Sequence, residues 1–296
     1  MHIHILSPSG HIIPEYIDQA QIRLEAHGHR VTVGKHAKGK FGRFAGREEE
    51  RIADLQDALN KEDIDVILCS RGGYGLAQIV DKIDFSPLQQ HPKLLVGFSD
   101  ITVLHNVWAR HSMPSLHALM TKHIATLPEN DEALLSLFHC LKTNTNTPYP
   151  LIVPPHPLNR FGETTGILRG GNLSVLYGLR NTPFDLPDDK NTILFIEDVA
   201  EHAYHIDRMM QNLRLSGVLS RIKGLIIGQF SECEDDPSMM SSIMESIAHC
   251  VRDYEYPLCF NFPAGHVDYN LPLLFNTSTC LNINEQGAYL TYNTSK

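Results

Sequence analysis

The stretch KLLVGFSDITVLHNVWAR, residues 93–110, passes from a short apolar run through a glycine turn into residues with helical periodicity. The stretch DVILCSRGGYGLAQIVDKI, residues 65–83, repeats this order of strand, glycine turn and helix. Short continuous apolar runs are typical of strands that are buried on both faces of a parallel sheet. The repeated order therefore predicts a doubly wound parallel α/β sheet.

The residues before these stretches continue the alternation. The pattern predicts strands over 2–6 and 31–33 and helices over 14–26 and 47–60, the second helix beginning with a run of acidic residues that complements its dipole. In such sheets ligands bind outside the carboxyl ends of the strands. The turns RGGYG and GFSD, which follow two of the strands, are therefore the expected ligand-binding edge.

The second half of the chain has a different composition. Residues 143–159 are rich in Pro, Asn and Thr and have no periodicity, which is typical of a linker. Beyond them, short strand signals such as TILFI and GLIIG mix with helical patterns over 204–215 and 238–251. We therefore predict a parallel α/β domain over 1–145, a linker over 146–160 and a smaller, strand-rich, barrel-like mixed α/β domain over 161–296.

Composition excludes several classes of protein. The chain has 296 residues, 42% of them hydrophobic, and its 34 acidic and 25 basic residues give a net charge of -9. Because the basic residues form no block, nucleic acid is not an expected partner. The start MHIHILSPSG has no basic segment followed by an apolar one, and no apolar run approaches the roughly 20 residues of a membrane helix. No membrane association is expected, and the cytoplasm is the expected compartment.

The pattern of potential metal ligands also argues against a metal site. The six cysteines contain no CxxC pair, which favours reduced, mostly buried thiols. His2 and His4 would share one face of a strand, but no acidic or cysteine ligand follows at a zinc-like spacing and HExxH is absent. We predict neither a metal nor a cofactor.

Ser99, in the turn GFSD, has two interpretations. A hydrolytic serine stands at a sharp turn between strand and helix, with the amide of the next residue, Asp100, free to donate to an oxyanion. Gly97 matches the first glycine of the GxSxG pattern, but Ile101 stands in place of the second. From this segment alone, a helix cap is the simpler interpretation.

The glycine-rich turn RGGYG also has two interpretations. As a dinucleotide-binding loop it lacks the third glycine of GxGxxG, and no acid-ended strand follows about 20 residues later. Closely spaced glycines also let backbone amides approach a ligand, so Gly72 or Gly73 is suited to donate to an oxyanion. Arg71 is suited to hold a substrate carboxylate, although an arginine at this position is more often part of a surface ion pair.

Two further candidates lie in the second half of the chain. Glu197 directly follows an apolar strand and is suited to orient an imidazole, or else it simply charges the start of the next helix. His266 lies in the loop FPAGHVDYNLPL, where a lone histidine is usually a surface residue. Together Ser99, Glu197 and His266 are the residue types of nucleophilic catalysis with a base and an orienting acid. Sequence spacing alone does not bring them together.

Five motifs in order, RGGYG, GFSDIT, GGNLSVL, FIEDVAEHAYHIDRMM and GHVDYNLPL, resemble those of the L,D-carboxypeptidases, the muramoyltetrapeptide carboxypeptidase family of serine peptidases. The resemblance implies a two-domain homodimer without a metal. It implies Ser99 as nucleophile, Glu197 as orienting carboxylate and His266 as general base, with Asp100 and the RGG turn at the oxyanion hole. The residues expected to bind substrate are Arg71, Tyr74, His117 and Asn172.

The activity that the resemblance implies is release of the terminal D-alanine from murein tetrapeptides, which in cytosolic members serves peptidoglycan recycling. The chain departs from the family pattern at four positions: Ala118, Leu119, Ala200 and His205. These departures leave open a related immunity peptidase that cuts peptide-nucleotide antibiotics. Two other classes also stay open: an oxidoreductase that holds a dinucleotide with RGGYG, and a non-catalytic protein that binds sugar peptides.

Overall fold

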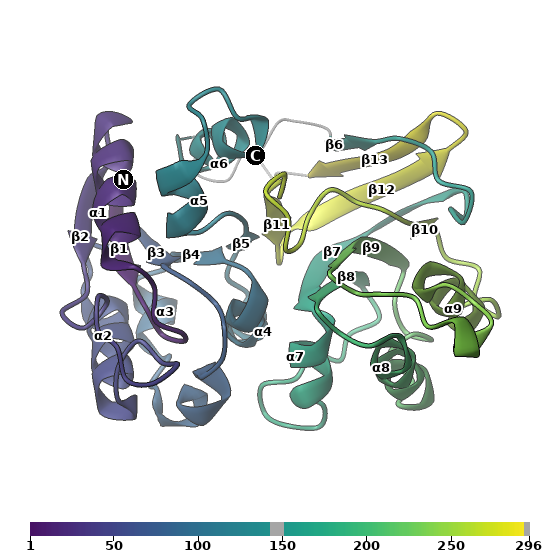
Figure 1. The fold of residues 1–296 in the computed structure, drawn as a ribbon, viewed down its shortest axis with the longest axis horizontal. Coiled ribbons are helices and arrows are strands. Elements are labelled where there is room, and N and C mark those ends of the chain that lie inside the picture. Colours follow the sequence, from purple (N-terminus) through teal and green to yellow (C-terminus); the bar gives the residue numbers. More distant parts are fainter. Residues whose placement is uncertain (143–150, 293–296) are drawn as a thin grey trace. The chain divides into compact units, whose positions relative to one another are not determined.

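The computed structural model describes residues 1–142 and 151–292, which fold into two compact units, each built on its own sheet (Figure 1). Unit 1 comprises Met1–Thr145 together with Asp268–Leu274, and unit 2 comprises Asn146–Val267 together with Phe275–Lys296. The chain therefore returns to unit 1 late in the sequence. The expected division into consecutive segments, 1–145 and 161–296, did not contain this return.

The sheet of unit 1 has the order β11-β5-β4-β3-β1-β2. Its strands are β1 (His2–Leu6), β2 (Arg30–Val33), β3 (Val66–Cys69), β4 (Leu94–Gly97), β5 (Ser115–His117) and β11 (Leu273–Phe275). The pairs that join β1 to β5 through this order are parallel, which confirms the predicted parallel sheet. Because β2 and β3 lie on opposite sides of β1, the strand order reverses between β1 and β3, and ligands bind at such points.

Helices and short 3₁₀ turns connect these strands. They are α1 (Pro14–Ala26), α2 (Glu48–Asn60), α3 (Pro87–Gln90), α4 (Thr102–Arg110), α5 (Thr121–Thr126), α6 (Glu132–Lys142), η1 (Leu76–Gln78), η2 (Val80–Lys82) and η3 (Ser99–Ile101). The helix predicted after RGGYG is wrong in type, because two 3₁₀ turns stand there.

The sheet of unit 2 has the order β10-β9-β8-β7-β12-β13-β6. Its strands are β6 (Leu151–Val153), β7 (Gly162–Asn172), β8 (Thr192–Val199), β9 (Gly224–Ser231), β10 (Leu258–Cys259), β12 (Ser278–Asn284) and β13 (Gly287–Tyr292). The run from β7 to β10 is parallel, and β12, β13 and β6 add antiparallel strands.

A barrel is not confirmed for unit 2. Within the described part of the chain the sheet order ends at β10 and β6 and does not close. Strand signals in a sequence indicate where strands lie along the chain, whereas closure depends on tilt and stagger between strands, which a sequence pattern does not display. The predicted linker also changes: β6 lies within 146–160 and pairs with β13, while residues 146–150 lie outside the described residues.

Helices α7 (Leu173–Gly178), α8 (Ala203–Leu215) and α9 (Ile243–Cys250) pack on the parallel part of this sheet through a buried cluster that includes Met210 and Phe260. The predicted helix over 238–251 is preceded by a 3₁₀ turn, η4 (Pro237–Met239), because Ser242 and Glu245 form a capping box that fixes the start of α9.

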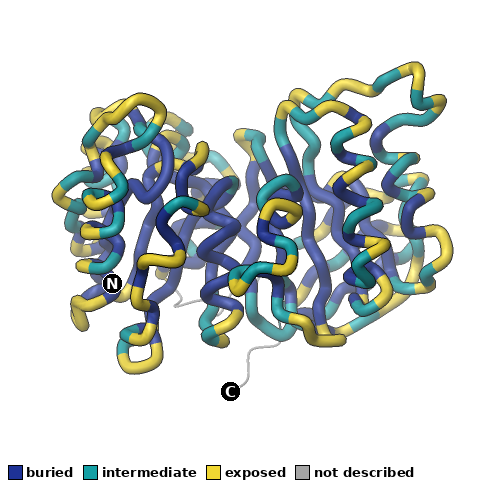
Figure 2. Tube along the Cα trace, turned by 90° about the horizontal axis from the view of Figure 1, so that it is seen from below, coloured by how far each residue is buried: buried dark blue, intermediate teal, exposed yellow. Residues whose placement is uncertain are grey.

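Burial follows the layers of each unit. Figure 2 shows the strands largely buried and the exposed residues gathered on outer helix faces and loops. Both β3 and β4 are buried along their whole length, as expected for central parallel strands. None of the helices in the described residues combines the length and apolar character needed to cross a bilayer.

Candidate functional site

Ser99 lies at the sharp turn between β4 and α4. Its φ is 68°, in the left-handed region that costs a residue with a side chain roughly 1–3 kcal/mol. The helix α4 begins at Thr102 with Ile101 at its N-cap, so the interpretation of Ser99 as the cap of that helix is wrong. A strained serine between strand and helix is typical of a nucleophile elbow.

The missing second glycine of the elbow has a structural explanation. A Cβ built on Gly97 would lie 2.9 Å from Cγ1 of Ile101 and 3.3 Å from Cβ of Cys69. The Ile101 side chain, which is fully buried, therefore occupies the space that Gly97 leaves open. The close approach of helix and strand needs a glycine on one side only, and here the strand supplies it.

The RGGYG turn passes directly beside Ser99. A Cβ on Gly72 would lie 2.6 Å from Cβ and 2.9 Å from Oγ of Ser99, so the turn fits only because residue 72 has no side chain. The carbonyl of Gly72 accepts a hydrogen bond of 2.9 Å from the amide of Gly10, which joins the turn to the loop after β1. Backbone of the predicted oxyanion turn and the predicted nucleophile are thus neighbours within unit 1.

We expect Gly72→Ala to lower catalytic turnover by about 10²–10³-fold, because the added methyl group must displace either Ser99 or the turn that supplies oxyanion donors. Gly178→Ala is a matched control, since a Cβ there meets nothing within 4 Å. Steady-state kinetics of both variants, with circular dichroism to verify folding, measure the effect. Equal turnover in the two variants would contradict it.

The side chain of Asp100 joins three loops and was not anticipated, since the sequence pointed only to its amide. The residue is 4% exposed, and its Oδ2 accepts hydrogen bonds from Oγ of Ser9 at 2.5 Å and from the amide of Leu76 at 3.0 Å. Burial raises the pKa of this carboxyl, and the hydrogen bonds and Arg51 partly oppose the rise. Asp100 thus connects the ends of β1, β3 and β4 beneath the site.

Arg51 on α2 holds the same loops from the other side. The residue is 2% exposed, and its Nη1 donates to the carbonyls of Pro8 at 3.0 Å and Gly75 at 2.9 Å. Its guanidinium stands 4.9 Å from the ring centre of Phe44. Sequence reasoning missed this residue because an arginine within an amphipathic helix normally faces solvent.

We expect Arg51→Met to lower the free energy of unfolding by about 3 kcal/mol, because two buried carbonyls lose a charged donor. Arg47→Met, at the start of the same helix, is the control: its guanidinium is exposed and stands over the ring of Phe41 at 4.7 Å. The control should lose less than about 1 kcal/mol. Urea denaturation measures both, and similar losses would show that Arg51 does not anchor the loops.

In unit 2, Glu197 and His266 form a close pair. Glu197 lies within β8 and is fully buried, and its Oε2 accepts from Nδ1 of His266 at 2.6 Å. The alternative in which Glu197 charges a helix start is wrong, because α8 begins only at Ala203. Gly265, with φ 138°, lets the loop that carries His266 lie close to Glu197, since a Cβ added to Gly265 would stand 3.1 Å from Oε2 of Glu197.

The surroundings of His266 make it a stronger base. Burial lowers its pKa, but the hydrogen bond and negative charge of Glu197, together with the charges of Asp198 and Glu232, outweigh burial and raise the pKa above the ordinary value. Fixing Nδ1 on a carboxylate leaves Nε2 as the nitrogen available for proton transfer.

The predicted substrate-binding residues have different environments. Arg71 and Tyr74 are exposed, and Arg71 donates to the carbonyl of His11 at 2.6 Å. Asn172 caps α7 and donates to Oδ1 of Asp198 at 2.9 Å, so this side chain already has a structural role. His117 is buried on β5 beside the rings of Phe98 and His105, a position that does not favour contact with a ligand.

The four residues that depart from the family pattern differ in burial, backbone conformation and contacts. Ala118 and Leu119 are fully buried. Ala200 has φ 56°, a left-handed conformation in which glycine carries no penalty. His205 pairs with Glu201 at 3.0 Å one helical turn away.

Comparisons with known proteins assign both halves of the chain to one family. Residues 3–118 match the LD-carboxypeptidase N-terminal domain, and residues 165–281 match the LD-carboxypeptidase C-terminal domain. A probable murein peptide carboxypeptidase of Bacillus subtilis is 30% identical over 97% of this chain and 91% of its own. The murein tetrapeptide carboxypeptidase of Pseudomonas aeruginosa is 29% identical over 89% of this chain and 87% of its own.

Solved structures show the same fold. The muramoyltetrapeptide carboxypeptidase of Oxalobacter formigenes has a TM-score of 0.87 at 25% identity, with 99% of each chain covered. The structure of MccF in complex with glutamyl sulfamoyl guanosine has a TM-score of 0.85 at 18% identity, covering 99% of this chain and 96% of that one. Both family domains match in order, and the two carboxypeptidases align with this chain over most of their length. The chain belongs to the LD-carboxypeptidase family of serine peptidases.

Proposed function

We propose that this serine carboxypeptidase releases the terminal D-alanine of murein tetrapeptides, with Ser99 as nucleophile, His266 as general base and Glu197 as the carboxylate that orients it. The observation that carries the proposal is the pairing of buried Glu197 with His266, whose pKa it raises, in a chain whose other unit holds a strained serine against a glycine turn. The names of the relatives supply the class of substrate.

The proposed reaction follows serine acyl transfer. Nε2 of His266 takes the proton of Ser99 as Oγ attacks the carbonyl between the diamino acid and D-alanine. The amides of Asp100 and of Gly72 or Gly73 donate to the oxyanion. His266 returns the proton to the nitrogen of D-alanine, the C–N bond breaks, and water then hydrolyses the acyl-enzyme by the same base.

Incubation of the protein with a murein tetrapeptide, read by mass spectrometry, tests the proposal. We expect free D-alanine and the tripeptide. The tripeptide and a tetrapeptide ending in L-alanine are the controls, and neither should release an amino acid. Absence of product from the D-alanine tetrapeptide would contradict the proposed substrate.

The similarity in fold to MccF supports a second candidate substrate, a peptide-nucleotide antibiotic. Its support is the fold alone, together with the departures Ala118, Leu119, Ala200 and His205 from the family pattern. A glutamyl sulfamoyl nucleoside offered beside the tetrapeptide distinguishes the two. Preferential release of glutamate would favour the immunity function.

The proposal also includes a cytoplasmic homodimer that takes part in peptidoglycan recycling. These features rest on the family resemblance, and each has its own test. Light scattering on the purified protein measures the number of subunits, and fractionation of cells that express it measures its compartment. A monomer, or a protein outside the cytoplasm, would contradict the corresponding feature.

A further inference from the structure

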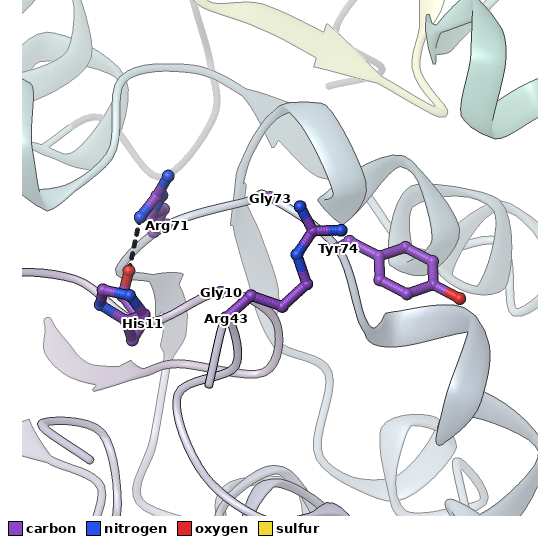
Figure 3. Close-up of a pocket in the computed structure, with 6 residues that line it drawn as sticks. All are labelled: Gly10, His11, Arg43, Arg71, Gly73 and Tyr74. Carbon is purple, nitrogen blue, oxygen red and sulfur yellow. Dashed lines mark hydrogen bonds between the residues drawn. The ribbon is translucent and has the colours of Figure 1, made fainter. Parts of the chain in front are cut away.

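A cavity of about 300 Å³ lies in unit 1 at the point where the strand order reverses. Two of the residues around it follow β1, one precedes α2 and three belong to RGGYG; they are Gly10, His11, Arg43, Arg71, Gly73 and Tyr74 (Figure 3). The loops after β1, β2 and β3 therefore form its walls. Its size suits a small chemical group or a single residue.

The cavity carries positive charge. In Figure 3 the side chain of Arg71 turns toward the carbonyl of His11, whereas the guanidinium of Arg43 lies on the side of Gly73 and Tyr74. Across the described ranges 1–142 and 151–292, no carboxylate forms an ion pair with Arg43 or Arg71. Burial and the positive charges of Lys40 and Arg71 lower the pKa of His11, which also lines the cavity.

One residue of the glycine turn, Gly72, links the cavity to Ser99. Gly73 lines it, and the neighbouring Gly72 lies so close to Ser99 that a Cβ there would stand 2.9 Å from Oγ. Gly10, which also lines the cavity, donates its amide to the carbonyl of Gly72 at 2.9 Å. A ligand group in the cavity therefore lies beyond the glycine turn from the predicted nucleophile, within the length of one amino acid.

A carboxypeptidase requires a carboxylate at that distance. The terminal carboxylate of its substrate belongs to the residue immediately after the scissile carbonyl, and consecutive Cα atoms are about 3.8 Å apart. Guanidinium groups match the planar geometry of a carboxylate and bind it with two parallel hydrogen bonds. A peptide that continued past this point would leave both arginines without an anion.

We propose that the cavity between Arg43 and Arg71 binds the terminal carboxylate of the departing residue and so restricts the enzyme to the last residue of a chain. This inference rests on the proposed function and adds the origin of its exopeptidase specificity. Arg71 also fastens the glycine turn through the carbonyl of His11, so Arg43 is the cleaner residue to change.

The test compares a tetrapeptide that ends in D-alanine with the same peptide that ends in D-alaninamide. We expect the wild-type enzyme to prefer the free acid by about 10²-fold in kcat/KM. Arg43→Gln should lose about 10–100-fold on the acid, mostly in KM, and remain unchanged on the amide. Arg43→Lys should fall between them, because it retains the charge without the planar fork.

Arg47→Gln is the matched control, since it removes the same charge from a nearby exposed arginine that stands over the ring of Phe41 and does not line the cavity. It should retain the preference for the acid. Equal losses of Arg43→Gln on acid and amide, with D-alanine release by the wild type intact, would overturn this inference alone. Absence of release by the wild type from both peptides would overturn the proposed function, and this inference with it.

Discussion

Ser99→Ala is expected to lower D-alanine release from a murein tetrapeptide by about 10⁴–10⁶-fold, with the protein still folded. The substitution removes only Oγ, the atom that would form the acyl-enzyme. Alanine retains the Cβ of serine, so the left-handed φ of 68° costs it the same as it costs serine. The loss should therefore fall on kcat and leave substrate binding in place.

Ser112→Ala provides a closely matched control. Ser112 is exposed, lies in the same unit and has φ 57°. The substitution therefore removes the same hydroxyl group at a similar backbone conformation. Its rate should equal that of the wild type. Release of D-alanine by Ser99→Ala at more than about a tenth of the wild-type rate would remove the serine mechanism, and thermal melts of both variants would detect any difference in folding.

Glu197→Gln is expected to lower kcat by about 10⁴-fold. A carboxylate oxygen only accepts, so Oε2 holds Nδ1 of His266 in its protonated form at 2.6 Å. A glutamine amide can present its NH₂ group to Nδ1, which places the proton on Nε2 and removes the base that should face the serine. Asp198→Asn changes the adjacent buried carboxylate without touching the Glu197–His266 bond, and it should cost far less.

The pH dependence of the same variants gives a second readout. A general base acts in its neutral form, so kcat/KM falls as the pH drops through the pKa of His266. Because Glu197, Asp198 and Glu232 together raise that pKa, the acid limb of the wild type should lie above pH 6.5, the ordinary value for histidine. Glu197→Gln removes the main charge that raises the pKa of His266, so burial should lower this pKa and move the acid limb of the residual activity to lower pH. An unmoved limb would show that another group controls it.

The parallel core of unit 1 could be predicted because β3 and β4 are continuous apolar runs, each followed by a glycine turn. The strand β11 could not, because three apolar residues near the end of the chain carry no signal for the sheet they join. The same limit applies to β6, which lies in a segment whose prolines and polar residues favoured a linker.

Within the site, residue types and motifs indicated Ser99, Glu197 and His266, but only burial and distance separate a pair such as Glu197 and His266 from ordinary surface residues. Asp100 and Arg51 show a different limit. Their side chains connect loops that are distant in sequence, and a charged residue beneath such loops has the same local pattern as one in solvent.

The position of β11 has a consequence for biosynthesis. The ribosome delivers the strands β1 to β5 early, but the strand that covers the edge of β5 is translated only after the long first segment of unit 2, which ends at Val267. An uncovered strand edge is a template for pairing with other chains, so the nascent unit 1 has a long interval of exposure to aggregation. The unit that carries Ser99 cannot complete its sheet until the chain has passed His266, which makes assembly of the first unit depend on synthesis of the second.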